Sequence, residues 1–198
     1  MKRRSFIKKS IAISSAPFIT SGLLARTIWE KSTGKKPFNL NYAPHFGMFK
    51  HNAGDDPIDQ LQFMYDHGFR SLEDNSMKSR SKSDQNKISK KMSRLGMDMG
   101  VFVAHKIYWR EPNLTSGDKE LHDEFVQNVK DSIEIAKRVN ARWMTVVPGH
   151  VDLKKEMAYQ TANVVEALRR ASKLLEPHGL IMVLEPLNWW TNHAGQFL

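Results

Sequence analysis

The stretch that decides the fold is LIMVLEPLN, residues 180–188. Five consecutive apolar residues, 180–184, lead into Glu185 and Pro186. A continuous apolar run of this length is typical of a strand covered on both faces of a parallel sheet. An ionised carboxylate at the end of such a strand is costly unless it is paired or bound to a metal ion. We therefore expect Glu185 either to form an ion pair with a Lys or Arg, or to act as a metal ligand, a general acid/base, or both.

Four more extended runs precede this one, and segments with helical spacing of apolar residues separate them. The order is strand, helix, strand, helix, and so on, which predicts a parallel sheet because parallel neighbours need crossover connections. The predicted strands are residues 38–44, 69–75, 97–105, 142–150 and 180–184, and the helices between them carry apolar positions at 58–65, 88–95, 121–139 and 164–175.

Two α/β architectures fit this alternation. A doubly wound sheet needs five or six strands, whereas a (β/α)₈ TIM barrel needs eight in about 250 residues. The first predicted strand is not followed by G-x-G-x-x-G, which a dinucleotide-binding sheet would carry. The residue pattern alone leaves both architectures open.

Polar and aromatic residues cluster at the carboxyl ends of the predicted strands, where both architectures bind ligands. Three histidines follow three different strands, so we predict a binding rim. The rim comprises His45, Glu73 to Asn75, His105, Trp109, His150, Glu185 and Asn188. The remaining histidines divide by position: His67 and His178 precede helix-ending glycines, His122 is predicted to be solvated on a helix, and His51 and His193 are unassigned.

Charge is concentrated at the N-terminus. Residues 1–36 hold nine Lys or Arg and one Glu, a net charge of +8, whereas the remainder holds 21 basic and 20 acidic residues, a net charge of +1. A nearly neutral body gives no support to nucleic-acid binding, which needs concentrated positive charge. The chain has no cysteine, so neither disulfides nor thiolate metal sites can form.

The leader has the layout of a secretory signal, with a basic start and a modestly apolar stretch from residue 11 to 25. Residues 3–8, RRSFIK, resemble the twin-arginine export motif. The alternative is an ordinary basic amphipathic helix. The apolar stretch is too short and polar for a stable membrane span. We predict a signal peptide and linker over 1–36, a barrel-type domain over 37–198, and export to the periplasm.

Three segments, FRSLEDNSMKSR (69–80), VVPGH (146–150) and ANVVEALRRASKLLEPHGLIMVLEPLN (162–188), resemble the hydroxypyruvate isomerase group of the xylose isomerase-like TIM barrels. The resemblance favours the (β/α)₈ barrel, with about five βα units present. It implies a metal-assisted aldose–ketose type isomerase that acts on a small sugar or hydroxy-carbonyl substrate. In the family, the glutamate of strand five binds a divalent cation, Mg²⁺ or Mn²⁺, and moves a proton. By residue match this is Glu185.

In the family the remaining metal ligands and a second glutamate come from strands six to eight, which this sequence does not include. We therefore expect an incomplete metal site and little or no activity from this chain alone. From their location, His45, His105, Trp109, His150 and Asn188 are predicted to bind substrate. The alternative is a non-catalytic sugar-binding or interaction protein that retains the rim. The sequence leaves open the exact substrate, the metal and the oligomeric state. A homo-oligomer is one of the open alternatives.

Overall fold

The computed structural model describes residues 35–198, which form one compact unit. The predicted export motif and the apolar stretch that follows it lie outside the described residues. No helix from residue 35 onward is long and apolar enough to cross a membrane.

Four short strands form two parallel pairs within the described part of the chain. Strand β1 (Ser71–Leu72) pairs with β2 (Asp98–Met99), and β3 (Trp143–Val146) pairs with β4 (Ile181–Leu184). Isolated parallel bridges, Met99 to Ala141 and Val103 to Thr145, join the two pairs. The predicted strand order and parallel direction are thus confirmed for four segments, and these residues do not close a barrel.

The prediction of a strand over residues 38–44 was wrong. This segment forms no strand, and only the bridge between His45 and Glu73 links its end to the sheet. Its backbone turns back on itself, because the Tyr42 N–H donates to the Leu40 carbonyl at 3.0 Å. Phe38, Leu40 and Tyr42 are all exposed, so no buried face holds the segment in an extended register.

Four longer helices follow the predicted apolar spacing. They are α2 (Pro57–Asp66), α3 (Lys82–Leu95), α4 (Lys119–Val139) and α5 (Met157–Leu175). Helices α2, α3 and α4 begin at side-chain caps from Asp56, Ser81 and Asp118, and α3 ends at Gly96 in the left-handed conformation. Short turns of helix complete the set: α1 (Lys50–Ala53), η2 (Met77–Ser79), η3 (Leu114–Ser116) and η4 (Glu176–His178).

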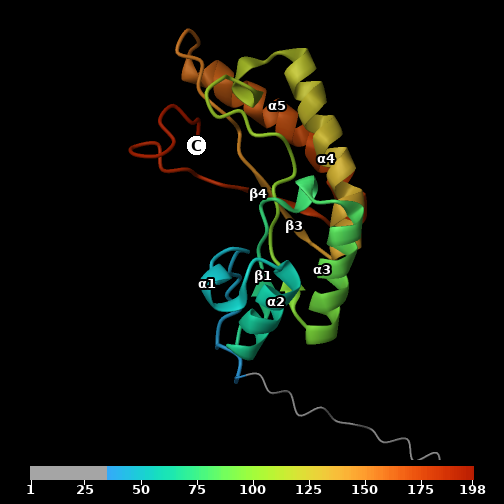
Figure 1. Ribbon diagram of the computed structural model, residues 1–198. Coiled ribbons are helices and arrows are strands. Elements are labelled where there is room, and N and C mark those ends of the chain that lie inside the picture. The colour runs from blue at the N-terminus through green and yellow to red at the C-terminus, as the bar shows by residue number, and fades with distance from the viewer. Residues whose placement is uncertain (1–34) are drawn as a thin grey trace, which may run out of the picture. The chain divides into compact units, whose positions relative to one another are not determined.

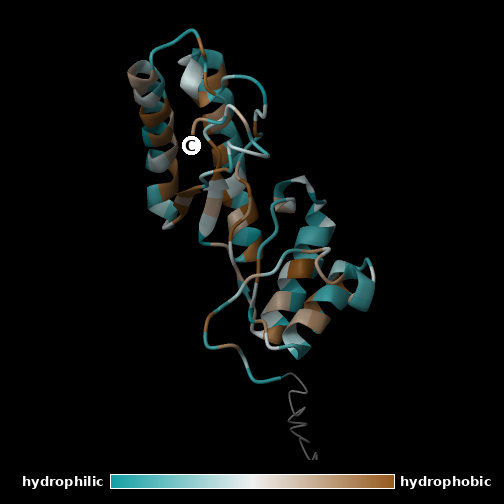
Figure 2. Ribbon diagram, turned by 90° about the vertical axis from the view of Figure 1, so that its left-hand side faces the viewer, coloured by the Kyte–Doolittle hydropathy of each residue, from teal (hydrophilic) through white to brown (hydrophobic). Residues whose placement is uncertain are grey.

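Helices α3, α4 and α5 lie next to one another along the strands (Figure 1). Brown, hydrophobic residues recur along one side of each helix, with teal residues on the other (Figure 2). The buried core joins these faces to the strands through fully buried side chains such as Phe125, Val129, Met144 and Val146. Packing of this kind fixes where each strand ends, and so where the rim residues lie.

His122 does not lie on a solvated face as predicted. It is buried, and its Nε2 lies 3.0 Å from the carbonyl oxygen of Leu114. The η3 turn folds back over the first turns of α4 and covers the imidazole. This histidine therefore joins a turn to a helix, and helical spacing alone could not show the covering turn.

Candidate functional site

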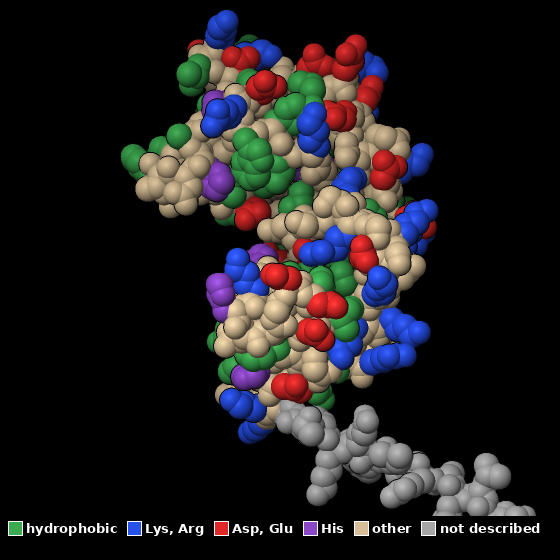
Figure 3. Space-filling view, viewed as in Figure 1, with side chains coloured by type: hydrophobic (Ala, Val, Ile, Leu, Met, Phe, Trp, Pro, Cys, Tyr) green, Lys and Arg blue, Asp and Glu red, His purple; other side chains and the backbone are tan. Residues whose placement is uncertain are grey.

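A cavity of about 450 Å³ opens at the carboxyl ends of the strands. Its wall includes three of the predicted site residues, His105, Trp109 and Glu185, which come from segments far apart in the sequence. On the face shown in Figure 3, acidic and histidine side chains lie beside hydrophobic ones. The full wall is formed by Asn75, Val103, His105, Ile107, Trp109, Glu185, Leu187 and His193.

Glu185 is placed by the strand before it. Its N–H donates to the Val146 carbonyl at 3.1 Å, which continues the β3–β4 pairing by one residue. Its carboxylate has no hydrogen bond or ion pair to any residue from 35 to 198. The alternative of a structural ion pair with Lys or Arg is therefore not seen in the described chain. An unpaired carboxylate in a cavity wall is suited to contact a ligand.

Glu73 is a second carboxyl group at this rim. Its Oε1 lies 3.6 Å from Nε2 of His45, and the two residues are also joined by a parallel backbone bridge. Burial raises the pKa of Glu73; the nearby His45 opposes this, and the negative charge of Glu185 adds to it. The two carboxyl groups are therefore close enough to influence one another electrostatically.

His105 is held by the backbone through both ring nitrogens. Its Nδ1 lies 2.8 Å from the Lys106 carbonyl, and its Nε2 lies 3.1 Å from the Val147 N–H. Since Nε2 accepts, Nδ1 must carry the proton and donate, so the ring is the neutral Nδ1–H tautomer. Burial lowers the pKa of His105 to about 4. His105 thus contributes a ring edge to the cavity wall and has no spare nitrogen for a ligand.

Lys78, in the η2 turn, connects the same segment to α4. Its ammonium group donates to the carbonyls of Ala104 at 3.1 Å and Asn128 at 2.7 Å, and to Oγ of Ser132 at 3.1 Å. Ser132 in turn donates to the Ala104 carbonyl at 2.6 Å. Burial lowers the pKa of Lys78. All three ammonium protons have acceptors, so this lysine fixes the backbone just before His105.

The C-terminal segment packs beside the cavity. The rings of Trp109 and His193 stack at 5.2 Å between centroids, and the Gln196 side chain donates to the Trp109 carbonyl at 2.9 Å. The Phe197 N–H donates to the Gly149 carbonyl at 2.9 Å. These contacts anchor the segment after β4 to the loops after β2 and β3, and they bring His193 into the wall.

Three predicted site residues lie outside the cavity wall. His45 is next to Glu73, as described. His150 binds its neighbour's backbone, since its Nδ1 lies 2.8 Å from the Val151 carbonyl, and its ring packs against Gly195. Asn188 is exposed, and its side chain accepts from the Thr191 N–H at 3.3 Å in a local turn. Their role in substrate binding stays a prediction.

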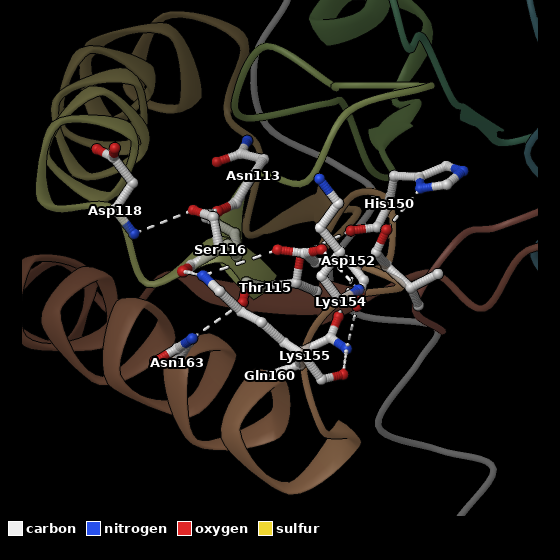
Figure 4. A network of polar contacts seen from close by, with 12 residues as sticks. Asn113, Thr115, Ser116, Asp118, His150, Asp152, Lys154, Lys155, Gln160 and Asn163 are labelled. Carbon is white, nitrogen blue, oxygen red and sulfur yellow. Dashed lines mark hydrogen bonds and ion pairs between the residues drawn. The ribbon is translucent and has the colours of Figure 1, made fainter.

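A polar network fixes the loop that follows His150 (Figure 4). The Thr115 hydroxyl donates to the His150 carbonyl at 2.6 Å, and the Asn163 side chain donates to the Thr115 carbonyl at 2.9 Å. Buried Gln160 accepts from the Asp152 N–H at 2.8 Å and donates to the Asp152 carbonyl at 2.9 Å. Helix α5 therefore holds two rim loops in place through neutral hydrogen bonds.

Residues 35–198 contain no group of three or more His, Asp or Glu side chains arranged to hold a metal ion. Glu185 is the one acidic side chain in the cavity wall. A divalent cation needs several oxygen or nitrogen ligands. The described residues thus do not fit a complete metal centre.

The structure adds three polar residues that the predicted ligand set did not include: Asn75, which lies in the cavity wall, Glu73 and His193. Glu73 was located at a strand end, but its pairing with His45 depends on a bridge between segments 28 residues apart in the sequence. His193 reaches the cavity through its stacking on Trp109. His193 lies in an irregular segment, so no periodic pattern in the sequence pointed to it. Glu73 lies at a strand end, and that position was a signal that could have identified it.

Comparison with known proteins identifies the family of folds to which this architecture is similar. The family model described as "Xylose isomerase-like TIM barrel" matches residues 61–198. No curated protein sequence gives a significant match.

Among solved structures, a family 2 AP endonuclease from Brucella melitensis superimposes with a TM-score of 0.65 at 19% identity, covering 79% of this chain and 58% of that one. D-psicose 3-epimerase from Clostridium cellulolyticum H10, solved with D-tagatose, gives a TM-score of 0.59 at 17% identity, covering 78% and 55%. An L-ribulose 3-epimerase gives a TM-score of 0.57 at 16% identity, and the match covers 78% of this chain and 52% of that one.

This chain spans between half and three fifths of the length of these structures. At such identities the likeness shows a shared fold, and it decides between the two architectures that the residue pattern left open. The family match covers well over half of the sequence. The chain belongs to the xylose isomerase-like TIM barrel family.

Proposed function

We propose that this chain carries part of the active site of an aldose–ketose type isomerase, similar to hydroxypyruvate isomerase, that acts on a small hydroxy-carbonyl compound or sugar. The observation that carries the proposal is the carboxylate of Glu185, which lines a cavity at the carboxyl ends of parallel strands without a cationic partner from residue 35 onward. Structural neighbours that are named as sugar epimerases support the substrate class.

In this proposal Glu185 removes the proton from the hydroxyl-bearing carbon next to the substrate carbonyl. The electron pair of that C–H bond forms the carbon–carbon double bond of an enediol, and the carbonyl oxygen takes up the charge or a proton. A proton is then returned to the former carbonyl carbon, the former carbonyl oxygen ends as a hydroxyl group, and the hydroxyl oxygen of the neighbouring carbon loses its proton to become the new carbonyl, which completes the exchange of aldose and ketose. We assign only the first proton transfer to a residue of this chain.

The neighbouring groups suit this role. Glu73 is a second carboxyl group near Glu185, and burial, with a smaller effect from the charge of Glu185, raises the pKa of Glu73. Trp109 offers a half-exposed aromatic face to the carbon-bound hydrogens of a sugar, and Asn75 offers amide groups to hydroxyls. His105, Val103 and Leu187 supply the less polar wall.

A divalent cation would polarise the substrate carbonyl, and Glu185 would be one of its ligands. Because the described residues provide no full ligand set, we expect this chain alone to bind Mn²⁺ weakly. We also expect its activity to be far below that of a complete enzyme. The measurements below therefore include binding as well as turnover.

The test compares the full chain with Glu185→Gln, which keeps the shape of the side chain and removes its charge. The matched control is Glu166→Gln, an exposed glutamate on α5. Mn²⁺ binding is measured by titration, and carbon-bound hydrogen exchange into hydroxypyruvate or a ketohexose is followed by NMR in D₂O. We expect Glu185→Gln, but not the control, to lose Mn²⁺ binding and any exchange. Equal Mn²⁺ affinity in all three proteins would refute the assignment.

A non-catalytic sugar-binding protein is the second candidate, favoured by the exposed aromatic rings at the rim, Trp109 and the stacked pair Trp189 and Trp190. Sugar-dependent quenching of tryptophan fluorescence that is unchanged in Glu185→Gln, with no deuterium exchange in either protein, would favour this candidate.

A further inference from the structure

The imidazole of His193 has no hydrogen-bond partner in the described part of the chain. Neither ring nitrogen bonds to any residue from 35 to 198, although the side chain is half-buried in the wall of the cavity that holds Glu185. His105, the other histidine of that wall, has both nitrogens bound to the backbone. His193 is therefore the histidine of this wall whose nitrogens are available to a ligand.

The position of the His193 ring is fixed by contacts on two sides. Its backbone N–H donates to the Asn188 carbonyl at 3.0 Å, and its carbonyl accepts from the Gln196 N–H at 3.1 Å. The ring stacks on the indole of Trp109, with 5.2 Å between the centroids and 26° between the planes. Gln196 is buried and also bonds to the Trp109 carbonyl. These contacts hold the imidazole at the cavity before any ligand arrives, which favours catalysis by positioning.

The proposed isomerisation moves protons on oxygen as well as on carbon. The carbonyl oxygen gains a proton and the neighbouring hydroxyl oxygen loses one, whereas Glu185 takes the carbon-bound proton. Histidine side chains suit the oxygen-bound protons, because their ordinary pKa is near neutral and an imidazole can both give and take a proton. Asn75 and Trp109, also in the wall, can donate hydrogen bonds but do not exchange protons in this way.

We propose that His193 carries the proton between the two substrate oxygens, a role that rests on the proposed function of Glu185. As Glu185 takes the proton from carbon, the C–H electron pair forms the carbon–carbon double bond. The π pair of the carbonyl moves onto its oxygen, which takes a proton from the protonated His193 ring. A carbonyl oxygen has two lone pairs, so contact with a cation leaves one for the ring.

The second half of the reaction restores the ring. The neutral imidazole removes the proton from the neighbouring hydroxyl, and the O–H electron pair forms the π bond of the new carbonyl. The carbon–carbon π pair then takes up a proton at the former carbonyl carbon. His193 ends with the proton that it had at the start, so the exchange needs no further reactant.

Two variants separate the ring of His193 from its nitrogens. His193→Phe keeps an aromatic ring for the stack on Trp109 and removes both nitrogens. His193→Gln keeps an N–H donor but cannot take up a proton. His178→Gln, at an exposed position, is the control. The probe is glycolohydroxamate, which presents two oxygens on adjacent atoms as an enediolate does.

The full chain and each variant are titrated with glycolohydroxamate by calorimetry, and histidine ring nitrogens are followed by ¹⁵N NMR. A hydrogen bond to a charged oxygen is worth about tenfold to a hundredfold in affinity. We therefore expect His193→Phe to bind at least tenfold more weakly, His193→Gln to lie between it and the unmodified chain, and His178→Gln to bind normally. The probe should shift the ring nitrogens of one histidine, and both His193 variants should lack that signal.

Turnover in D₂O gives a second measurement, with hydroxypyruvate or a ketohexose as the substrate. An enediolate whose oxygens cannot exchange a proton returns to its starting carbonyl. We expect His193→Gln to retain deuterium exchange into recovered substrate while it loses conversion, so the ratio of exchange to conversion rises at least tenfold. Glu185→Gln should lose both.

Unchanged hydroxamate affinity in His193→Phe would overturn this proposal, because the ring would then serve packing alone. An unmodified chain that does not bind the probe would overturn it as well. In both cases loss of Mn²⁺ binding in Glu185→Gln would still support the proposed function, so the two failures are distinguishable. Equal Mn²⁺ affinity in Glu185→Gln would instead remove the proposed function and this role with it. Circular dichroism of each variant shows that loss of binding is not loss of the fold.

Discussion

Protonation of His105 should destabilise this protein over a defined range of pH. Its Nε2 accepts the Val147 N–H and its Nδ1 faces the Lys106 carbonyl, so a second ring proton would displace the hydrogen bond from Val147. Burial lowers the pKa of this imidazole from 6.5 to about 4. In the unfolded chain the ring is exposed and takes up a proton near the ordinary pKa of histidine.

The direction in which pH changes the stability follows from the difference in proton uptake between the folded and unfolded states. Between pH 6.5 and 4 the unfolded state holds a proton on His105 that the folded state does not, so falling pH favours unfolding. The stability contributed by this residue is fully present above pH 6.5 and is lost as the pH approaches 4. Each pH unit is worth about 1.4 kcal/mol, so the drop in pKa from 6.5 to about 4 corresponds to about 3 kcal/mol.

Urea unfolding, followed by circular dichroism at several values between about pH 7.5 and 4, measures this effect. Wild type should lose about 3 kcal/mol more than His105→Gln across the range, because the variant has no group at this position to protonate. The exposed His178 provides the control, and His178→Gln should follow wild type. If the free energies of unfolding of wild type and His105→Gln ran parallel over the whole range, the buried neutral imidazole described here would be ruled out.

Two further predictions concern the elements that support the rim. Asp118→Ala removes the side-chain acceptor of two N–H groups in the first turn of α4 and should cost about 1 kcal/mol of unfolding free energy, whereas Asp118→Asn should retain most of it. Gly195→Ala places a Cβ against the His150 ring at a position with φ of +83°, so it should release the C-terminal segment and speed amide exchange at Val151 and Phe197. Exchange rates equal to wild type there would contradict this packing.

Periodicity predicted most of the framework because the core requires it. The apolar spacing along α4 buries Phe125, Val129 and Val139, and the runs that became β3 and β4 pair in parallel as expected. Periodicity failed where burial did not follow it. Residues 38–44 have the composition of a strand, yet Phe38, Leu40 and Tyr42 stay exposed. His122 has the spacing of a solvated position, yet a turn from outside the helix covers it.

The candidate site was predicted less completely, and the reason is physical. A strand-end position tells where a side chain starts, but its hydrogen bonds tell whether its polar atoms remain free. His105 is at the predicted rim, yet both of its nitrogens are used by the backbone. Glu185 is at the same rim with an unpaired carboxylate in the cavity wall. Two residues with equivalent positions in the sequence pattern therefore have opposite chemical availability. The difference arises because the extended segment after β2 continues to pair beside β3, through Val103 and Thr145, and so brings the His105 ring within reach of the Val147 N–H.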